Sequence, residues 1–395
     1  MLNFNYYAPT KVVFGKDTES KAGQLVKEFG GSKVLLHFGG QSAKKSGLLD
    51  RVEKSLSDAG IEFVELGGVV PNPRLSLVEK GIEICKKEKI DFILAVGGGS
   101  VIDSAKGISM GAVTDTPVWD FYLGKAKSTK CLPVGTVLTI SAAGSEMSCS
   151  SVITNEDGDF KKGLNNDLYR PRFSIMNPEL TMSLPEWQTF AGCADIMMHT
   201  MERYFAREKD HSMVVDSIAI GVMRSTLANS RILLKEPDNY NARAEIMWAG
   251  SLSHNTITGP FGNGDWATHQ LEHELSGMFD VTHGAGLAAL WATWARYVYK
   301  EDVDRFVSFA VDVMDIPAPK SDSEKEAVAL KGIDAMEQFF KDIKMPVRIR
   351  DLDVEWSEDI VLKLAEKASN NGTRCLGAIK KLTKEDMAEI YRKAY

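Results

Sequence analysis

The strongest constraint on the fold is an alternation of short apolar runs with helix-like segments in the first half of the chain. The runs have the length and composition of buried strands, and the segments between them have helical spacing. Strands and helices that alternate in this way are typical of a parallel sheet with helices on both faces. The expected strands are residues 33–38, 62–66, 91–96, 133–140 and 173–176, and the expected helices between the first three are 48–59 and 77–87.

The pattern changes near residue 184. Beyond it, strand-like runs become rare and long helical patterns follow, and Ser183 is the expected N-cap of the first helix, which carries Pro185 and Glu186 in its first turn. A chain of 395 residues is also too long for one ordinary core. We therefore expect an α/β, Rossmann-like domain over residues 1–184 and an all-helical domain over 185–395. Its first expected helices are 188–205, 212–234, 242–253 and 268–276.

Charge and composition exclude several classes of protein. The net charge is -7, which gives no electrostatic support to nucleic-acid binding. The sequence has no apolar stretch of roughly 18 residues that would span a membrane, and its N-terminus lacks the pattern of a signal peptide. The five cysteines are odd in number and form no CxxC pair. We expect a cytoplasmic protein that binds neither nucleic acid nor membrane.

Two glycine turns follow expected strands. Gly97-Gly98-Gly99-Ser100 opens a helix, where glycine admits a ligand close to the backbone and the free N–H groups favour a phosphate. The turn therefore indicates a pyrophosphate site, with a tight turn that binds nothing as the open alternative. The second turn, residues 39–42, has no carboxylate for a ribose diol, which favours NADP over NAD. Lys44 and Lys45 nearby are more typical of a solvated helix face.

Histidines are few and clustered. Three of the seven, His269, His273 and His283, fall within fifteen residues, and the first two share a helix face. Asp195 and His199 form a second pair with the same spacing. One aspartate and three histidines suit Fe²⁺ or Zn²⁺. A metalloprotease is not indicated, because His269 is followed by Gln270 rather than the glutamate of HExxH. The histidines interpreted as packed or surface residues are His37, His211 and His254.

These motifs, in this order, resemble the iron-containing (group III) alcohol dehydrogenases over essentially the whole chain. Within the family the sequence is most similar to the branch of butanol dehydrogenases and NADPH-dependent aldehyde reductases. One departure is Ala143, where the family usually has a threonine before Gly-Ser-Glu; Ser141 or Ser145 could supply the missing hydroxyl. The segments that carry the resemblance are 9–15, 70–73, 97–103, 138–139, 144–147, Asp195 with His199, 265–269, 272–275 and 283–284.

The resemblance implies a fold and a set of site residues. The fold is a dinucleotide-binding α/β domain followed by a helical metal-binding domain, as in dehydroquinate synthase. The implied ligands of one divalent metal, Fe²⁺ or Zn²⁺, are Asp195, His199, His269 and His283, with His273 beside them in the active site. The implied contacts to NADP or NAD are Gly39, Gly40, Ser42, Asn72, Gly97, Gly98, Gly99, Ser100, Asp103, Thr139 and Lys161.

The expected activity is hydride transfer between NAD(P)H and a small aliphatic aldehyde or primary alcohol. In such a site the metal is a Lewis acid; Asp195, His269 and His273 are the expected catalytic residues, with His273 as the proton relay. A polyol oxidoreductase resembling glycerol dehydrogenase and a metal hydrolase without dinucleotide are the alternatives. The resemblance also implies a homodimer. The apolar residues that favour an unbranched substrate are Met197, Met198, Phe261, Trp266 and Phe279.

Overall fold

The chain forms two compact units. The computed structural model describes residues 3–206, 212–262 and 264–395. The N-terminal unit comprises residues 7–184, and the C-terminal unit comprises residues 185–395 together with the described residues 3–6. Within the described parts of the chain, no helix combines the length and the hydrophobicity needed to cross a membrane.

The N-terminal unit is built on a six-stranded sheet in which every neighbouring pair is parallel. This sheet confirms the predicted α/β fold, and all five predicted strands are present. The strand at one edge, β1, was not predicted. In spatial order the strands are β1 (Lys11–Phe14), β8 (Phe173–Met176), β5 (Val134–Leu138), β4 (Phe92–Gly97), β2 (Lys33–Phe38) and β3 (Glu62–Leu66).

The strand order reverses between β2 and β4. From β2 the chain continues to β3 on one side, then crosses to β4 on the other, so that Phe38 at the end of β2 lies opposite Val96 in β4. In open parallel sheets the ligand crevice forms at the carboxyl ends of the strands where the order reverses. Both predicted glycine turns begin at these two ends, because Gly39 follows β2 and Gly98 follows β4.

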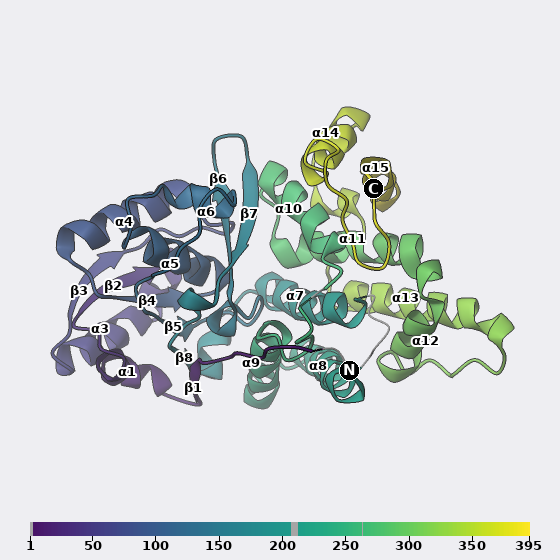
Figure 1. Ribbon diagram of the computed structural model, residues 1–395. Helices are drawn as coiled ribbons and strands as arrows, with labels where there is room; N and C mark the ends of the chain where they lie inside the picture. The colour runs from purple at the N-terminus through teal and green to yellow at the C-terminus, as the bar shows by residue number, and fades with distance from the viewer. Residues whose placement is uncertain (1–2, 207–211, 263) are drawn as a thin grey trace. The chain divides into compact units, whose positions relative to one another are not determined.

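Helices cover both faces of this sheet (Figure 1). Side chains alternate along each strand, so Val34 and Leu36 pack with α1 (Ala22–Glu28) and α3 (Leu48–Asp58). The opposite face carries α4 (Leu75–Glu88) and α5 (Gly99–Gly111), which pack on each other, and α5 also contacts β4. The unit also contains α2 (Ser42–Lys45), α6 (Val118–Tyr122), an antiparallel hairpin of β6 (Ser150–Asn155) and β7 (Phe160–Asn165), and short 3₁₀ turns that include η2 (Ser145–Met147).

The C-terminal unit is helical, as predicted. Its core is centred on α11, which contacts α7, α10, α13 and α15. Trp291 and Trp294 of this helix are fully buried. The predicted cap at Ser183 was wrong: Pro185 holds the N-cap position of α7, and its side chain makes no capping hydrogen bond. The α-helices of the described residues are α7 (Glu186–Tyr204), α8 (Met213–Leu233), α9 (Tyr240–His254), α10 (Ala267–Phe279), α11 (His283–Val298), α12 (Val303–Asp312), α13 (Lys325–Asp342), α14 (Glu358–Ala368) and α15 (Lys384–Ala394).

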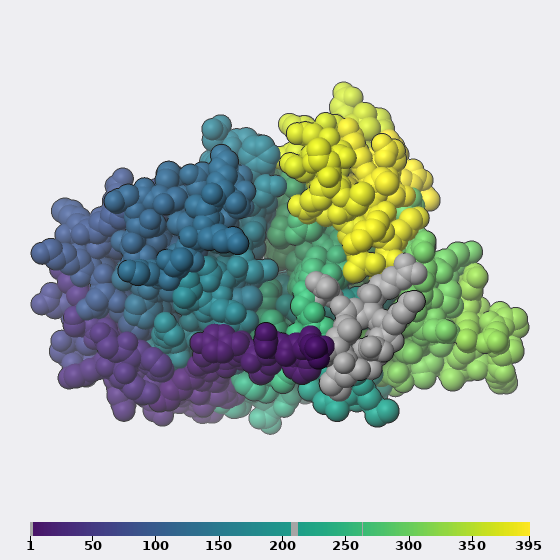
Figure 2. All heavy atoms as spheres, in the orientation of Figure 1, coloured from purple at the N-terminus to yellow at the C-terminus, as the bar shows by residue number. Residues whose placement is uncertain are grey.

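Residues 3–6 are exposed and appear in purple on the molecular surface in Figure 2. The ring of Phe4 packs edge-on against Phe261 of the C-terminal unit, with 5.4 Å between ring centroids. Phe261, one of the expected apolar wall residues, therefore has an aromatic partner within its own unit.

Candidate active site

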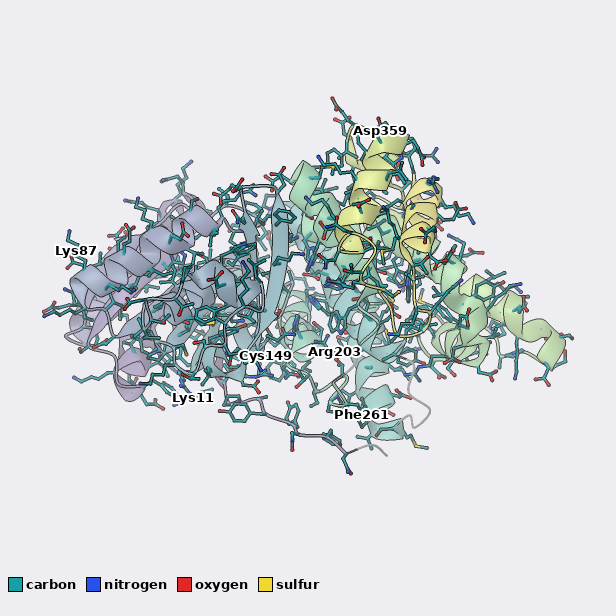
Figure 3. The ribbon with its side chains drawn as sticks, turned by 45° about the horizontal axis from the view of Figure 1, so that its top comes forward. Lys11, Lys87, Cys149, Arg203, Phe261 and Asp359 are labelled. Carbon is teal, nitrogen blue, oxygen red and sulfur yellow. The ribbon has the colours of Figure 1, made fainter. Side chains whose placement is uncertain are left out.

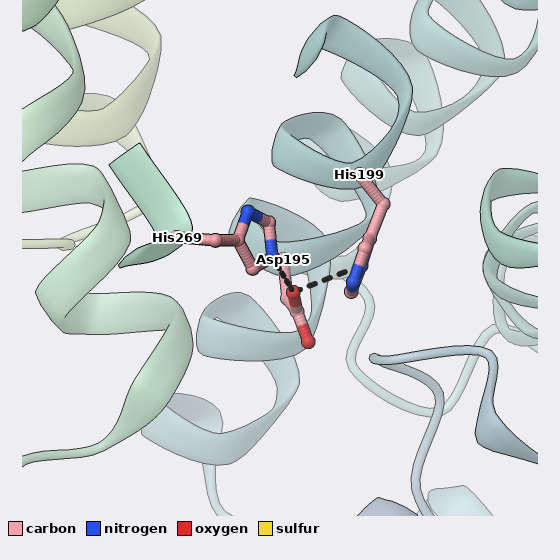
Figure 4. A group of neighbouring side chains, drawn as sticks. All are labelled: Asp195, His199 and His269. Atoms are coloured by element: carbon pink, nitrogen blue, oxygen red, sulfur yellow. Dashed lines mark ion pairs between the residues drawn. The ribbon is translucent and has the colours of Figure 1, made fainter. Parts of the chain in front are cut away.

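Four of the expected metal ligands converge in the C-terminal unit. Asp195 and His199 project from α7, and His269 projects from α10 toward them (Figure 4). Oδ1 of Asp195 lies 3.0 Å from Nδ1 of His199 and 3.8 Å from Nε2 of His269. His283, the first residue of α11, places its Nε2 3.9 Å from the same oxygen. A single carboxylate oxygen is thus surrounded by nitrogens of three imidazoles from three helices.

The facing atoms of the first three residues are buried and lack hydrogen bonds. Oδ1 of Asp195, Nδ1 of His199 and Nε2 of His269 have no hydrogen-bond partner among the described residues. Leaving a buried polar group unsatisfied costs about 1–3 kcal/mol. A divalent cation that accepts a lone pair from each atom would satisfy all three together. The donor set of one carboxylate and imidazole nitrogens fits Fe²⁺ or Zn²⁺.

Two buried glutamates contact the Nδ1 atoms of His269 and His283. Glu202 on α7 contacts Nδ1 of His269 and accepts the backbone N–H of the same residue at 3.1 Å. Glu272 on α10 contacts Nδ1 of His283 and accepts the hydroxyl of Ser276. When a carboxylate accepts a hydrogen bond from Nδ1–H of a histidine, the tautomer and the orientation of the ring are fixed, and Nε2 is free to bind a metal.

Neither glutamate was predicted from the sequence, although the spacing of both carries a signal. Glu202 lies seven residues after Asp195 and therefore on the same face of α7, and Glu272 lies three residues after His269 on α10. Acidic residues at these helical offsets from candidate ligands are the positions from which a ring nitrogen can be supported.

Burial and neighbouring charges set the protonation of the cluster. Burial lowers the pKa of His199 to about 4, although Asp195 raises it, so the ring is neutral at pH 7. Burial raises the pKa of Asp195, but His199, His269 and His283 together hold it well below its ordinary value. Burial lowers the pKa of His269, but Glu202 and Asp195 raise it to about 9. His199 and Asp195 are therefore ready to donate lone pairs, whereas a metal would displace a proton from His269.

Other aromatic side chains border the cluster. His273 lies beside it, with its ring centroid 5.7 Å from that of His283. The ring of Trp266 lies 5.4 Å from His269, and the guanidinium of Arg203, labelled in Figure 3, stands 4.6 Å from the ring centroid of Trp266. The indole is therefore held between a cation and a candidate ligand.

The histidines expected to have packing roles differ in their surroundings. His37 is fully buried in β2, where Nδ1 contacts the carbonyl of Leu66 at 2.8 Å and Nε2 contacts the hydroxyl of Ser104 at 2.9 Å. His254, at the end of α9, lies against the candidate ligand His199, with 4.1 Å between ring centroids. It is thus a neighbour of the cluster. His211 lies outside the described residues.

Most of the expected cofactor residues lie at the reversal point of the sheet. Gly39 and Gly40 follow β2, and Ser42 begins α2. Gly97 ends β4, and Gly98, Gly99 and Ser100 open α5, whose N-cap residue, Gly98, has no side chain to cap the helix. Thr139 follows β5 and donates its backbone N–H to the carbonyl of Gly97 at 3.0 Å. Asn72, which lies between β3 and α4, is buried and adopts a left-handed conformation with φ of 52°.

Three glycines in these turns differ in the space around them. A Cβ added at Gly40 would meet no atom within 4 Å, so this position is open. A Cβ at Gly98 would lie 3.0 Å from the side chain of Ile140, and one at Gly99 would lie 3.3 Å from Ala143. The loop after β5 therefore packs directly on the glycine turn, and a side chain at Gly98 would first clash with Ile140.

The two serines that could replace the missing threonine hydroxyl differ in their hydrogen bonding. Ser145 donates its hydroxyl to Oδ1 of Asp103 at 2.5 Å, so this hydroxyl is already used. The hydroxyl of Ser141 is buried and has no hydrogen-bond partner among the described residues. The other oxygen of Asp103 accepts the backbone N–H of Val152 at 2.9 Å, which joins α5 to the hairpin. Lys161, on the second strand of that hairpin, is buried.

Comparison with known protein families decides the assignment. Residues 9–178 match the model for iron-containing alcohol dehydrogenase, and residues 189–395 match the C-terminal region of the same family. The chain belongs to the iron-containing alcohol dehydrogenase family. This membership confirms the resemblance noted in the sequence and the predicted enzyme class, a metal-dependent alcohol dehydrogenase.

Several similar proteins are matched over their full length. The chain is 39% identical to NADH-dependent butanol dehydrogenase A of Clostridium acetobutylicum over 396 residues, which cover 100% of both chains. It is 32% identical to the NADPH-dependent aldehyde reductase of Escherichia coli K12, again over 100% of both chains. The crystal structure of NADH-dependent butanol dehydrogenase A from Thermotoga maritima superposes with a TM-score of 0.94 at 38% identity, covering 100% of this chain and 99% of that one.

Proposed function

We propose that this enzyme interconverts small unbranched aldehydes and primary alcohols with NAD(P)H, at a metal held by Asp195, His199, His269 and His283. The metal site is supported mainly by three buried atoms that have no hydrogen-bond partner in the described part of the chain: Oδ1 of Asp195, and one ring nitrogen each of His199 and His269 that lie 3.0 and 3.8 Å from it. The similar butanol dehydrogenase and aldehyde reductase support the substrate class. Membership of a dehydrogenase family gives no support to the alternative of a metal hydrolase.

Each residue around the proposed metal site has its own role. When bound, the metal supplies Lewis acidity toward the oxygen of the substrate. Glu202 and Glu272 orient the rings of His269 and His283, which fixes where that acidity acts. Asp195, His199 and His269 are buried, and burial strengthens the electrostatic interactions between them. We assign the proton relay to His273, which is buried within reach of the ligand His283.

The nicotinamide dinucleotide is proposed to bind the turns after β2 and β4. The uncapped N-terminus of α5 is suited to a pyrophosphate, because its N–H groups and the positive end of the helix dipole favour an anion. The open space at Gly40 and the absence of an acid in residues 39–42 admit a 2′-phosphate. The relatives include both an NADH-dependent and an NADPH-dependent enzyme, so we propose that both cofactors are accepted. The predicted preference for NADPH stays a prediction, as do the homodimer and the cytoplasmic location.

Metal analysis of variants tests the proposed ligands. We expect His269→Ala and His283→Ala to lose the bound metal and nearly all reduction of butanal. Both variants should still bind NADH, as measured by the change in NADH fluorescence. Asp359→Asn, an exposed carboxylate on α14, is the control and should keep metal and turnover. Full metal occupancy in both histidine variants would refute the site. Faster turnover with glycerol than with butanal would favour the polyol alternative.

A further inference from the structure

A lysine in the N-terminal unit is buried, and no carboxylate of the described residues forms an ion pair with it. Lys106 lies on α5 and is fully inaccessible to solvent. Burial lowers its pKa to about 8, which leaves the ammonium charged at pH 7. An isolated buried charge is costly unless hydrogen bonds compensate it. The position of Lys106 therefore requires a strong set of acceptors.

Five oxygens of one short loop surround the ammonium. They come from residues 145–150, which run from η2 to the start of β6, and they include both carbonyls and hydroxyls. An ammonium has only three N–H groups, so the five oxygens share them. The arrangement resembles the coordination of a small monovalent cation by oxygen ligands. The distances from Nζ are 2.8 Å to the carbonyl of Ser145, 2.8 Å to its hydroxyl, 3.1 Å to the carbonyl of Ser148, 3.3 Å to its hydroxyl and 2.6 Å to the carbonyl of Ser150.

One of these contacts continues to Asp103. Ser145 accepts a hydrogen bond from Lys106 and donates its own hydroxyl to Oδ1 of Asp103. The charges of Lys106 and Asp103 are therefore linked through a single serine. Since both charged residues lie on α5, the serine loop is held against this helix at two places.

The segment that precedes this loop, residues 139–144, borders the glycine turn. Ile140 and Ala143 pack over Gly98 and Gly99, and the backbone of Thr139 is bonded to Gly97. Residues 139–144 are thus fixed at their start by the sheet and at their end by the ammonium of Lys106. A shift of the serine loop would move the wall of the turn.

We propose that Lys106 is a positioning residue whose ammonium acts as a built-in monovalent cation, holding residues 145–150 so that the loop after β5 stays set against the glycine turn. Its effect on cofactor binding rests on the proposed function, whereas the oxygen cradle itself does not. Removing the ammonium leaves five oxygens directed at one point. The vacated place then suits NH₄⁺ and, because of its similar size, K⁺, whereas Na⁺ is too small and tetramethylammonium too large.

Lys106→Met tests the proposal, because methionine replaces the aliphatic chain and omits the ammonium. We expect its melting temperature to fall and its dissociation constant for NADH to rise at least roughly tenfold in sodium chloride. Ammonium chloride at equal ionic strength should restore most of both losses, potassium chloride should restore part of them, and tetramethylammonium none. Lys87→Met, which removes an exposed lysine from the outer side of α4, should respond to no salt in this way (Figure 3). Equal behaviour of Lys106→Met in all four salts, or wild-type affinity for NADH in sodium, would overturn the proposal.

Ser145→Ala provides the second test, which is needed if Lys106→Met does not fold. It removes only the hydroxyl between Lys106 and Asp103 and leaves the carbonyl contacts in place. We expect several-fold weaker NADH binding without loss of bound metal, and no recovery in ammonium. A folded Ser145→Ala with unchanged NADH affinity would overturn the positioning role. If the wild-type enzyme binds no dinucleotide, the proposed function fails, but the recovery of melting temperature in ammonium still tests the cradle.

Discussion

Replacing Glu202 with glutamine should weaken metal binding without removing a ligand. The carboxylate of Glu202 is completely buried and makes two contacts to His269, one to Nδ1 and one to the backbone N–H. Hydrogen bonds to a charged group contribute about 1.5–3 kcal/mol. Loss of an outer partner of a ligating histidine typically costs roughly 10- to 100-fold in metal affinity, which corresponds to about 1.4–2.7 kcal/mol. The two estimates agree, so we expect a loss in this range for Glu202→Gln.

Competition with a chromophoric chelator at pH 7 measures this loss directly, with the folded fraction checked by circular dichroism. Glu272→Gln should give a similar loss, because Glu272 supports His283 in the same way. Glu337→Gln is the matched control, since this mostly buried glutamate pairs with Arg296 on α11 and with other basic residues rather than with a histidine. Wild-type metal affinity in folded Glu202→Gln would refute the role of the Glu202 carboxylate in supporting His269.

Three further outcomes are expected in the N-terminal unit. Gly40→Asp should fold, because a Cβ at this position meets no atom within 4 Å. Its carboxylate should repel the 2′-phosphate and lower kcat/KM for NADPH relative to NADH by at least roughly tenfold. An unchanged ratio would show that this turn does not select the cofactor. Burial lowers the pKa of His37 from 6.5 to about 4, so the stability tied to its neutral form is present above pH 6.5 and is lost as the pH falls toward 4. When the pH is lowered from 7 to 5, the free energy of unfolding, measured with denaturant, should therefore fall by about 2 kcal/mol more in the wild type than in His37→Gln. An equal pH dependence of the two proteins would contradict the buried neutral ring. Ser141→Ala should weaken NADH binding by roughly 2- to 10-fold, the worth of about 0.5–1.5 kcal/mol for one hydrogen bond, and an unchanged dissociation constant would mean that this hydroxyl does not replace the missing threonine.

The central strands could be predicted because their burial is complete. All six residues of β4 and all five of β5 are buried, and such runs have no polar face to obscure the pattern. β1 has only four residues, none of them fully buried, and the hairpin strand β7 carries Lys161 and Lys162. A run of only four residues is too short to identify a strand from its pattern, and the polar hairpin strand lacks an apolar pattern, so both were missed.

The candidate ligands could be predicted because their signal is local. Asp195 and His199 lie one helical turn apart, and His269 and His283 stand out in a chain with few histidines. The contact of His254 with His199 has no such signal, because it depends on how the end of α9 meets α7. The roles of Glu202 and Glu272 likewise depend on helix packing, since each supports a ring on a different helix.

The two units stabilise buried charge in opposite ways, and this difference has a consequence for experiment. In the N-terminal unit the cation belongs to the chain, since Lys106 fills an oxygen cradle and is linked through Ser145 to Asp103. In the C-terminal unit the carboxylates of Asp195 and Glu202 pair with histidines, whose facing atoms remain unsatisfied until a cation is supplied from outside. A chelator should therefore weaken only the helical unit, and the exchange of sodium for ammonium should affect only Lys106→Met. The structure thus predicts that metal removal and loss of the lysine have separate effects on stability.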